Sequence, residues 1–225
     1  MEVQHLGRQE RVVVLGAGGH GDVIAWTLAC QGRAEVACFL DDREELHGTL
    51  TRSGQMVVGA CTSVDLVTDT ASHFVVAIGD NRARADRYAG AMDAGLVPWA
   101  AIHPSAVIAA QADIGAGLQA VAAAIVNPWA AIGENVILNT GCIVEHDCVV
   151  GSHSVVAQGV RLGEGVEVGE YAFLCIGVLA LPGVTIGAGT TVAAGAVVET
   201  DLPANVVAAG APAHVVGPAK RNALG

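Results

Sequence analysis

A six-residue repeat runs from residue 102 to residue 198 and restricts the possible fold more than any other feature of the chain. Counting in sixes from Ile102 gives seventeen positions, of which fifteen are Ile, Leu or Val and two are Ala. An α-helix has 3.6 residues per turn and cannot keep a period of six on one face, so an amphipathic helix is excluded. The repeat instead predicts short strands that meet at corners, each with one aliphatic side chain pointing inward.

A slower repeat of eighteen residues accompanies the first. It is formed by Gly115, Gly133, Gly151, Gly169 and Gly187. Eighteen residues make three strands, and therefore one turn of a triangular coil whose inward side chains stack on those of neighbouring coils. Glycine fits corners where a side chain would clash or where φ must be positive. Only 4% of the residues are aromatic while 52% are hydrophobic, which suits the thin interior of such a prism.

The N-terminal half predicts a small α/β domain with a Rossmann-like parallel sheet. Buried strands are expected at residues 11–15, 36–40 and 74–78, and an exposed helix is expected at 82–94. Alternating strands and helices with short connections are typical of a parallel sheet. We therefore divide the chain into four parts: a disordered lead-in at 1–10, an α/β domain at 11–101, the coils at 102–203 and a C-terminal tail at 204–225.

Charge and composition exclude several classes of partner. The net charge is −11, whereas nucleic-acid binding needs clustered Lys and Arg. No apolar run approaches the roughly 20 residues that span a membrane, and the first ten residues lack the layout of a signal peptide. The cysteines form no CxxC pair, and Cys142 and Cys148 are expected to be buried thiols. These observations predict a cytoplasmic protein without nucleic-acid or membrane partners.

The first strand of the α/β domain ends in a glycine-rich turn that is typical of phosphate binding. Gly16, Gly18 and Gly21 match G-x-G-x-x-G, and the helix that follows directs free N–H groups toward a pyrophosphate. Asp41 and Asp42 follow the second strand, where acids accept hydrogen bonds from sugar or base hydroxyls. NAD is one possible ligand, but under 100 residues are too few for a dinucleotide domain with a separate substrate site. We therefore favour a nucleotide-sugar over NAD and over a tight turn that binds nothing.

The third strand ends in a further polar group, Asp80-Asn81-Arg82, which is expected to line the same crevice. Arg82 is one of few cations available for a phosphate in this acidic chain. An exposed arginine at the start of a helix explains its presence equally well.

The coils carry one group of residues with evident chemistry, Glu145-His146-Asp147. An imidazole does not belong among stacked Val and Leu side chains, so His146 is expected near a corner and pointing outward. With an ordinary pKa near 6.5, it can take a proton from an attacking amine or hydroxyl at neutral pH, and a flanking carboxylate would hold its tautomer. His153 is the other histidine of the central coils, and two histidines are too few for a zinc site made of three histidines, so no metal is expected.

Between residues 12 and 216 the chain resembles the sialic acid O-acetyltransferase-like family of bacterial sugar acyltransferases, which carry hexapeptide repeats. The motifs behind the resemblance are GAGGHG at 16–21, AIGDN at 77–81 and NTGCIVEHDC at 139–148, in this order. Within that family, the chain is most similar to N-acetyltransferases of nucleotide-linked 4-amino sugars from the bacillosamine and perosamine pathways. The resemblance implies that the coils form a left-handed parallel β-helix, although crossover chirality alone would predict the opposite hand.

The resemblance also implies a role for individual residues. It places the general base on His146 and the acid that raises its basicity on Asp147. Contacts to the nucleotide-sugar fall on Gly18, Gly19, His20, Asp41, Asp42, Gly79 and Arg82. Contacts to acetyl-CoA fall on Val155, Glu164, Ile176 and Ala194. Glu164 departs from the small residue of the family, and its carboxylate would lie near an anionic coenzyme.

The expected activity is acetyl transfer from acetyl-CoA to the 4-amino group of a UDP- or GDP-linked 4-amino-4,6-dideoxy sugar, in bacterial glycan biosynthesis. O-acetylation of a free sugar such as sialic acid is an alternative, and a module that binds nucleotide-sugar without turnover is another. Relatives are trimers with active sites between adjacent prisms, so the resemblance implies a homotrimer. The residues agree, because a thin prism cannot bury outward apolar side chains such as Trp129, Phe173 and Leu179 alone.

Overall fold

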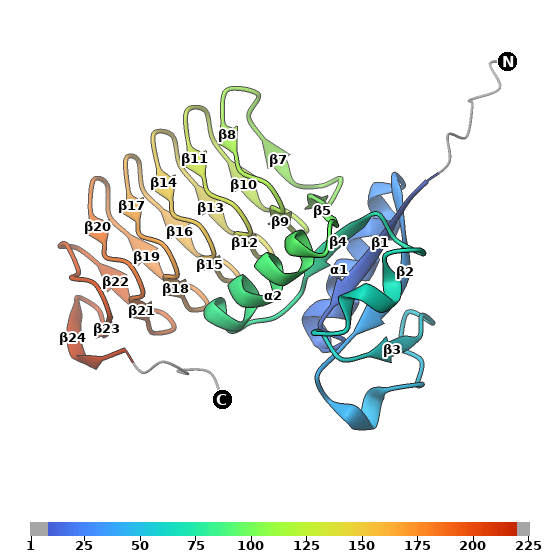
Figure 1. The fold of residues 1–225 in the computed structure, drawn as a ribbon. Helices are drawn as coiled ribbons and strands as arrows, with labels where there is room; N and C mark the ends of the chain where they lie inside the picture. Colours follow the sequence, from blue (N-terminus) through green and yellow to red (C-terminus); the bar gives the residue numbers. More distant parts are fainter. Residues whose placement is uncertain (1–8, 220–225) are drawn as a thin grey trace, which may run out of the picture.

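The computed structural model describes residues 9–219, which form two parts in contact with each other (Figure 1). A small sheet with two α-helices comes first, and a long stack of short strands follows it. The chain passes from one part to the other through β5 (Val97–Pro98) and β6 (Ala101–Ile102). The predicted lead-in at 1–10 lies almost entirely outside the described residues, as does the end of the predicted tail, from residue 220.

The N-terminal sheet has five parallel strands in the order β3-β2-β1-β4-β5. The strands that precede β5 are β1 (Glu10–Leu15), β2 (Ala34–Leu40), β3 (Val57–Gly59) and β4 (His73–Val76). They are connected through α1 (Gly19–Gln31), α2 (Asn81–Asp93) and two short 3-10 helices, Glu44–Leu46 and Val64–Val67. This confirms the predicted parallel α/β fold and adds β3 and β5, which are too short for their side-chain pattern to reveal.

Strand β1 is buried on both faces, because successive side chains of a strand point to opposite sides. Val13 and Leu15 pack in a core with Tyr88 of α2. Val12 and Val14 pack in a second core that contains residues of α1 and also Val121 of the coils. The second core therefore joins the sheet to the stack of strands, and the glycine-rich turn after β1 is held against it.

The coils form a parallel β-helix with three faces. The eight-stranded face contains β6, β9 (Gln119–Ala120), β12 (Ile137–Leu138), β15 (Val155–Val156), β18 (Phe173–Leu174), β21 (Thr191–Val192), β23 (Val206–Gly210) and β24 (Ala213–Pro218). The six-stranded face contains β7 (Val107–Ile108), β10 (Ile125–Val126), β13 (Ile143–Val144), β16 (Arg161–Leu162), β19 (Leu179–Ala180) and β22 (Val197–Val198). The five-stranded face contains β8 (Asp113–Ile114), β11 (Ala131–Ile132), β14 (Val149–Val150), β17 (Glu167–Val168) and β20 (Thr185–Ile186).

The six-residue repeat coincides with the inward residue of each two-residue strand. Along the six-stranded face, Val126 pairs with Val144 and Val144 pairs with Leu162, eighteen residues apart each time. These side chains belong to one continuous core that runs along the axis of the prism. The predicted triangular coil of eighteen residues is therefore confirmed.

The eighteen-residue glycine repeat has a steric cause. A Cβ on Gly133 would lie 2.6 Å from the backbone nitrogen of Ser152 in the next coil, and one on Gly115 would lie 2.6 Å from that of Glu134. These glycines do not have positive φ, unlike Gly141 and Gly159 at other corners. Of the two reasons for a corner glycine, the close approach of the next coil is the one that applies to this repeat.

Helix α2 is not exposed on all sides, contrary to the expectation for residues 82–94. One of its faces is buried, and Arg84 on that face is fully enclosed. The Arg84 guanidinium donates to the carbonyls of Ile78, at 3.0 Å, and of His153, at 2.5 Å. Burial lowers the pKa of Arg84 to about 10. The helix pattern does not predict this face, because an arginine is rarely fully buried.

The two α-helices among residues 9–219 have 13 residues each, and neither is long and apolar enough to cross a membrane.

Candidate active site

The glycine-rich turn combines two glycines that shape the backbone with two that leave space above it. Gly16 has a φ of 107°, and a Cβ there would lie 2.7 Å from the carbonyl oxygen of Ala77. A Cβ on Gly21 would collide with the carbonyl oxygen of Gly16. In contrast, Gly19 has nothing within 4 Å of a Cβ position, and Gly18 has only the Arg43 guanidinium at 3.8 Å. The open side of the turn is thus available to a ligand at the N-terminus of α1.

Asp41 holds this turn together. Its carboxylate accepts a hydrogen bond from the Ala17 amide at 2.7 Å and one from Nε of Arg43 at 2.8 Å. Burial raises the pKa of Asp41, but the hydrogen bonds from Arg43 and Ala17 outweigh burial and lower the pKa to about 2. Asp41 is therefore ionised at neutral pH, and it brings the Arg43 guanidinium close to Gly18.

Arg43 is a residue that sequence reasoning missed. It lies just after the Asp41-Asp42 pair, and its side chain is about half exposed. An arginine within two residues of an acid that closes a glycine-rich turn is the signal that could have revealed it.

The second acid, Asp42, has different partners. It accepts a hydrogen bond from the Cys61 amide and pairs with Arg87 of α2, each at 2.9 Å. Asp42 therefore links the end of β2 to α2.

The polar group after β4 contacts the coils. Asp80 caps α2 by accepting from the Ala83 amide at 2.8 Å, and Asn81 donates to the carbonyl of Tyr171 at 2.8 Å. Arg82 is exposed, and its guanidinium carbon lies 5.0 Å from the centre of the Tyr171 ring.

A cavity of about 340 Å³ lies between the N-terminal part and the eight-stranded face. It brings together Gly19, His20 and Gly79 from the predicted substrate site with Val155 from the predicted coenzyme site. Nε2 of His20 lies 2.9 Å from the side-chain oxygen of Gln119, and burial lowers the pKa of His20. His20 is therefore neutral at pH 7 and is held against the coils.

Two of the predicted coenzyme residues continue from this cavity along one corner of the prism. Ile176 and Ala194 are eighteen residues apart, and so are Gln158 and Thr140, which line the cavity. Ile176 is 57% exposed. The four residues form a column between the eight-stranded and six-stranded faces.

His146 lies at a different corner, where the chain passes from β13 to β14. Its Nδ1 is 2.7 Å from a carboxylate oxygen of Asp147, and its Nε2 is 3.5 Å from one of Glu164. The side chain is 45% exposed, as expected for a residue that points out of the prism. The hydrogen bond to Asp147 raises the pKa of His146 above its ordinary value, and the charges of Glu164 and Glu145 act in the same direction. The carboxylates therefore favour the imidazolium that forms when His146 accepts a proton.

In the described part of the chain, no side chain of the N-terminal sheet or its helices forms a hydrogen bond or ion pair with His146. The glycine-rich turn faces the eight-stranded face, whereas His146 lies at the corner between the six-stranded and five-stranded faces. One chain therefore does not place its own base beside its own glycine-rich turn.

His153 is enclosed rather than available. Its ring stacks on Tyr171 with 5.1 Å between the ring centres, and its Nδ1 lies 3.0 Å from the side-chain nitrogen Nδ2 of Asn135. Burial lowers the pKa of His153. Within residues 9–219, no three His, Cys, Asp or Glu side chains form a group that could hold a metal ion.

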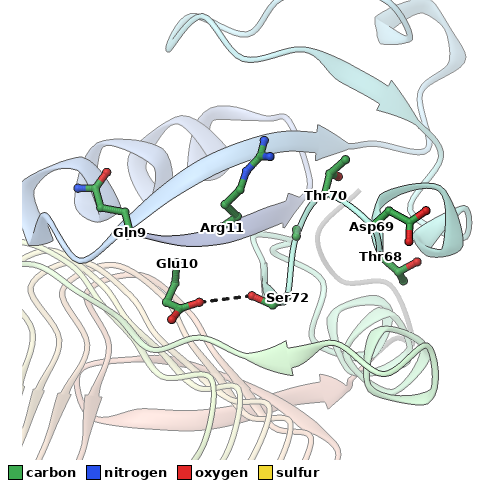
Figure 2. A pocket seen from close by; sticks show the side chains of 8 residues that line it. Gln9, Glu10, Arg11, Thr68, Asp69, Thr70 and Ser72 are labelled. Atoms are coloured by element: carbon green, nitrogen blue, oxygen red, sulfur yellow. Dashed lines mark hydrogen bonds between the residues drawn. The ribbon is translucent and has the colours of Figure 1, made fainter. Parts of the chain in front are cut away.

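A second cavity, of about 330 Å³, lies at the opposite edge of the N-terminal sheet (Figure 2). It is lined by residues 9–11, at the start of β1, and by residues 68–72, which precede β4. Ligands of parallel sheets bind at the carboxyl ends of the strands, so the cavity beside the glycine-rich turn is the better candidate.

Comparisons with known proteins agree with this geometry. The family model of the PglD N-terminal domain matches residues 11–90. The crystal structure of PerB from Caulobacter crescentus, in complex with CoA and GDP-perosamine, is 40% identical, with a TM-score of 0.86 over 92% of this chain and 97% of that one. The acetyltransferase domain of PglB from Neisseria gonorrhoeae, in complex with acetyl coenzyme A, is 32% identical, with a TM-score of 0.86 over 93% of this chain and 100% of that one.

A variant of the Caulobacter enzyme, described as GDP-perosamine N-acetyltransferase, is 38% identical to this chain over 92% of its length, with a TM-score of 0.87. The family resemblance predicted from the sequence is therefore confirmed. The chain belongs to the sugar N-acetyltransferases of the hexapeptide-repeat family.

Proposed function

We propose that the protein transfers the acetyl group of acetyl-CoA to the 4-amino group of a UDP- or GDP-linked 4-amino-4,6-dideoxy sugar, in bacterial glycan biosynthesis. The observation that carries the proposal is the exposed His146–Asp147 pair, with a separation of 2.7 Å, on coils otherwise filled with aliphatic side chains. The sequence identity of 38% to a GDP-perosamine N-acetyltransferase supports a nucleotide-linked amino sugar as the substrate.

His146 is the general base of the reaction. Because Asp147 engages Nδ1, a neutral ring keeps its hydrogen on Nδ1 and leaves the lone pair of Nε2 free. The amine nitrogen attacks the thioester carbonyl, and Nε2 takes the proton that nitrogen must lose as the C–N bond forms. The same proton then passes to the departing sulfur, which leaves as the CoA thiol.

The glycine-rich turn holds the diphosphate of the acceptor. Gly18 and Gly19 leave the N-terminus of α1 open, and Arg43 provides a cation beside Gly18. Asp41 keeps Arg43 in this position by a bidentate pair. The sugar extends from the turn toward the cavity formed by His20 and Gly79, and the coenzyme lies along the column of Ile176 and Ala194.

The protein acts as a homotrimer that packs through the six-stranded face. Most outward residues of this face are apolar, and Val107 is 60% and Leu179 is 41% exposed in the single chain. Trp129, at the corner next to His146, is 66% exposed. Phe173 is a different case, because it lines the cavity beside the N-terminal part. The six-stranded face is flanked by both the His146 corner and the Ile176 corner, so packing around it joins the base of one chain to the ligand sites of another.

A cytoplasmic location fits this chemistry, because the donor is acetyl-CoA. The six cysteines are free, as expected for a reducing compartment.

O-acetylation of a free sugar such as sialic acid would not require the open glycine-rich turn and Arg43. A binding module without turnover would not require the His146–Asp147 pair. Neither alternative uses both features, whereas N-acetylation of a nucleotide-linked sugar uses both.

The test is an assay of CoA release with acetyl-CoA and four acceptors: GDP-perosamine, a UDP-linked 4-amino-4,6-dideoxy sugar, free sialic acid and perosamine without nucleotide. We expect release with at least one of the nucleotide-linked amino sugars and little with the two free sugars. Equal rates with and without the nucleotide would contradict the proposal, and so would release with sialic acid alone.

A further inference from the structure

The Glu164 carboxylate does not fit a contact with the phosphates of the coenzyme. Coenzyme A carries several phosphate charges, and a carboxylate beside them would repel them. The register of the coils places Glu164 elsewhere. Because Ile143 pairs with Arg161 and Val144 with Leu162, the corner after β16 lies directly beside the corner after β13. Glu164 therefore belongs to the same corner as His146, one coil further along.

The carboxylate of Glu164 lies next to the reactive nitrogen of the base. Its Oε2 is 3.5 Å from Nε2 of His146, and Nε2 is the nitrogen that Asp147 leaves free. The Glu164 side chain is 63% exposed. In the described part of the chain, no side chain and no backbone N–H donates a hydrogen bond to this carboxylate. The carboxylate can therefore accept a hydrogen bond from a ligand.

The other two acids at this corner are already engaged. Glu145 accepts a hydrogen bond from Nδ2 of the Asn127 side chain at 2.9 Å, and Asp147 pairs with Nδ1 of His146. The neighbouring cation is Arg161 on β16, and within residues 9–219 it forms no ion pair with any of these three acids. Arg161 is also the only Lys or Arg between residues 88 and 219. The surroundings of Nε2 are therefore strongly negative, and they suit a cationic group.

We propose that Glu164 binds the protonated amino group of the acceptor beside Nε2 of His146 and thereby selects an amine over a hydroxyl acceptor. The inference rests on the proposed acetyl transfer and assigns Glu164 to the acceptor instead of the coenzyme. An ammonium donates a charge-assisted hydrogen bond to Glu164, whereas a hydroxyl donates only a neutral one.

Protons balance in this scheme. The bound ammonium has three N–H bonds, and it loses one proton to solvent to become the nucleophilic amine. The amine forms the C–N bond and passes a second proton to Nε2 of His146. That proton moves to the thiolate as the C–S bond breaks, and the third hydrogen stays on the amide product.

The matched variants are Glu164→Gln and Glu167→Gln. Both remove one negative charge and keep the size of the side chain, but Glu167 lies on the five-stranded face, three residues away from the corner. Dissociation constants are measured by calorimetry at pH 7 for two pairs of ligands that differ only at position 4. These pairs are GDP-perosamine with GDP-rhamnose, and UDP-4-amino-4,6-dideoxy-N-acetylglucosamine with its 4-hydroxyl counterpart.

In one of the two pairs, the amino sugar is the acceptor that the enzyme uses. For that pair, we expect the wild type to bind the amino sugar about tenfold or more tightly than its 4-hydroxyl counterpart, because one charge-assisted hydrogen bond contributes on this scale. Glu164→Gln should lose most of this preference, and Glu167→Gln should keep it. Full preference in Glu164→Gln would overturn the proposal, as would an altered acetyl-CoA affinity with an unchanged amine preference.

The outcome for Glu164 can be separated from that for the proposed function. CoA release by the wild type tests acetyl transfer itself. A wild type that transfers while Glu164→Gln keeps its amine preference overturns the role of Glu164 alone. A wild type that transfers to neither nucleotide-linked amine overturns both.

Discussion

Replacement of His146 by Ala removes the imidazole that lies between the carboxylates of Asp147 and Glu164. Both contacts are made by the ring nitrogens, at 2.7 Å and 3.5 Å. With alanine at this position, only carboxylates remain at this corner to take the amine proton, and a carboxylate is a much weaker base than an imidazole. A positioned general base contributes about 10²–10⁴-fold to a rate. We therefore expect kcat to fall by about 10²–10⁴-fold near pH 7, with little change in the dissociation constants of acetyl-CoA and nucleotide-sugar.

The pH dependence of this enzyme follows from the direction of the His146 pKa shift. The base acts when it is neutral, so kcat/KM falls as the pH drops through the pKa of His146. The hydrogen bond to Asp147 raises this pKa, with help from the charges of Glu164 and Glu145. The acidic limb should therefore lie above the ordinary histidine value of about 6.5. Asp147→Asn removes the main cause, so it should move the limb to lower pH with a smaller loss of rate than His146→Ala.

CoA release measured from pH 6 to pH 9 tests both variants, with calorimetry of both substrates as the second readout. His214→Ala is a matched control, because His214 is exposed on β24, far along the chain from the catalytic corner. Unchanged kcat/KM in His146→Ala across pH 6 to 8 would refute the reasoning. Acetyl transfer would then depend on positioning alone.

The remaining predictions concern ligand binding, assembly and the core. Gly18→Val should abolish nucleotide binding in calorimetry without changing acetyl-CoA affinity, and parallel loss of both ligands would indicate misfolding instead. Asp41→Ala should weaken nucleotide binding by about 1–3 kcal/mol, because it releases Arg43 from the turn. Replacement of Arg43 itself should weaken nucleotide binding by a similar amount. Leu179→Glu should convert the trimer into monomers in light scattering, whereas a wild type of monomer mass at micromolar concentration would exclude the shared site. Leu162→Ala should lower the free energy of unfolding by about 2–5 kcal/mol in urea, since Leu162 is buried inside the coils.

The glycine-rich turn illustrates which features could be predicted from the local sequence and which required the tertiary structure. Its backbone requirements at Gly16 and Gly21 arise within one strand, turn and helix, so the spacing of the glycines predicted the turn. The cation beside it was not predicted, because Arg43 reaches Gly18 only through the carboxylate of Asp41. Arg82 was expected there on account of its place after β4, but its guanidinium lies over Tyr171 of the coils. The assignment of ligand contacts at both positions stays a prediction.

The sequence by itself determined the prism, because a coil places its inward side chain by a local rule that repeats every six residues. It also showed that glycine recurs every eighteen residues, and it indicated Glu145-His146-Asp147 as the group with evident chemistry. The close approach of the next coil, which is the cause of the glycine repeat, became clear only in the structure. The coil of eighteen residues also implies which residues share a corner. Only the tertiary structure decided what packs on each face, because the three faces share one sequence pattern. The buried face of α2 around Arg84, the separation of His146 from the glycine-rich turn and the approach of Glu164 to Nε2 all depend on contacts between residues distant in sequence, to which a hydrophobic repeat is insensitive.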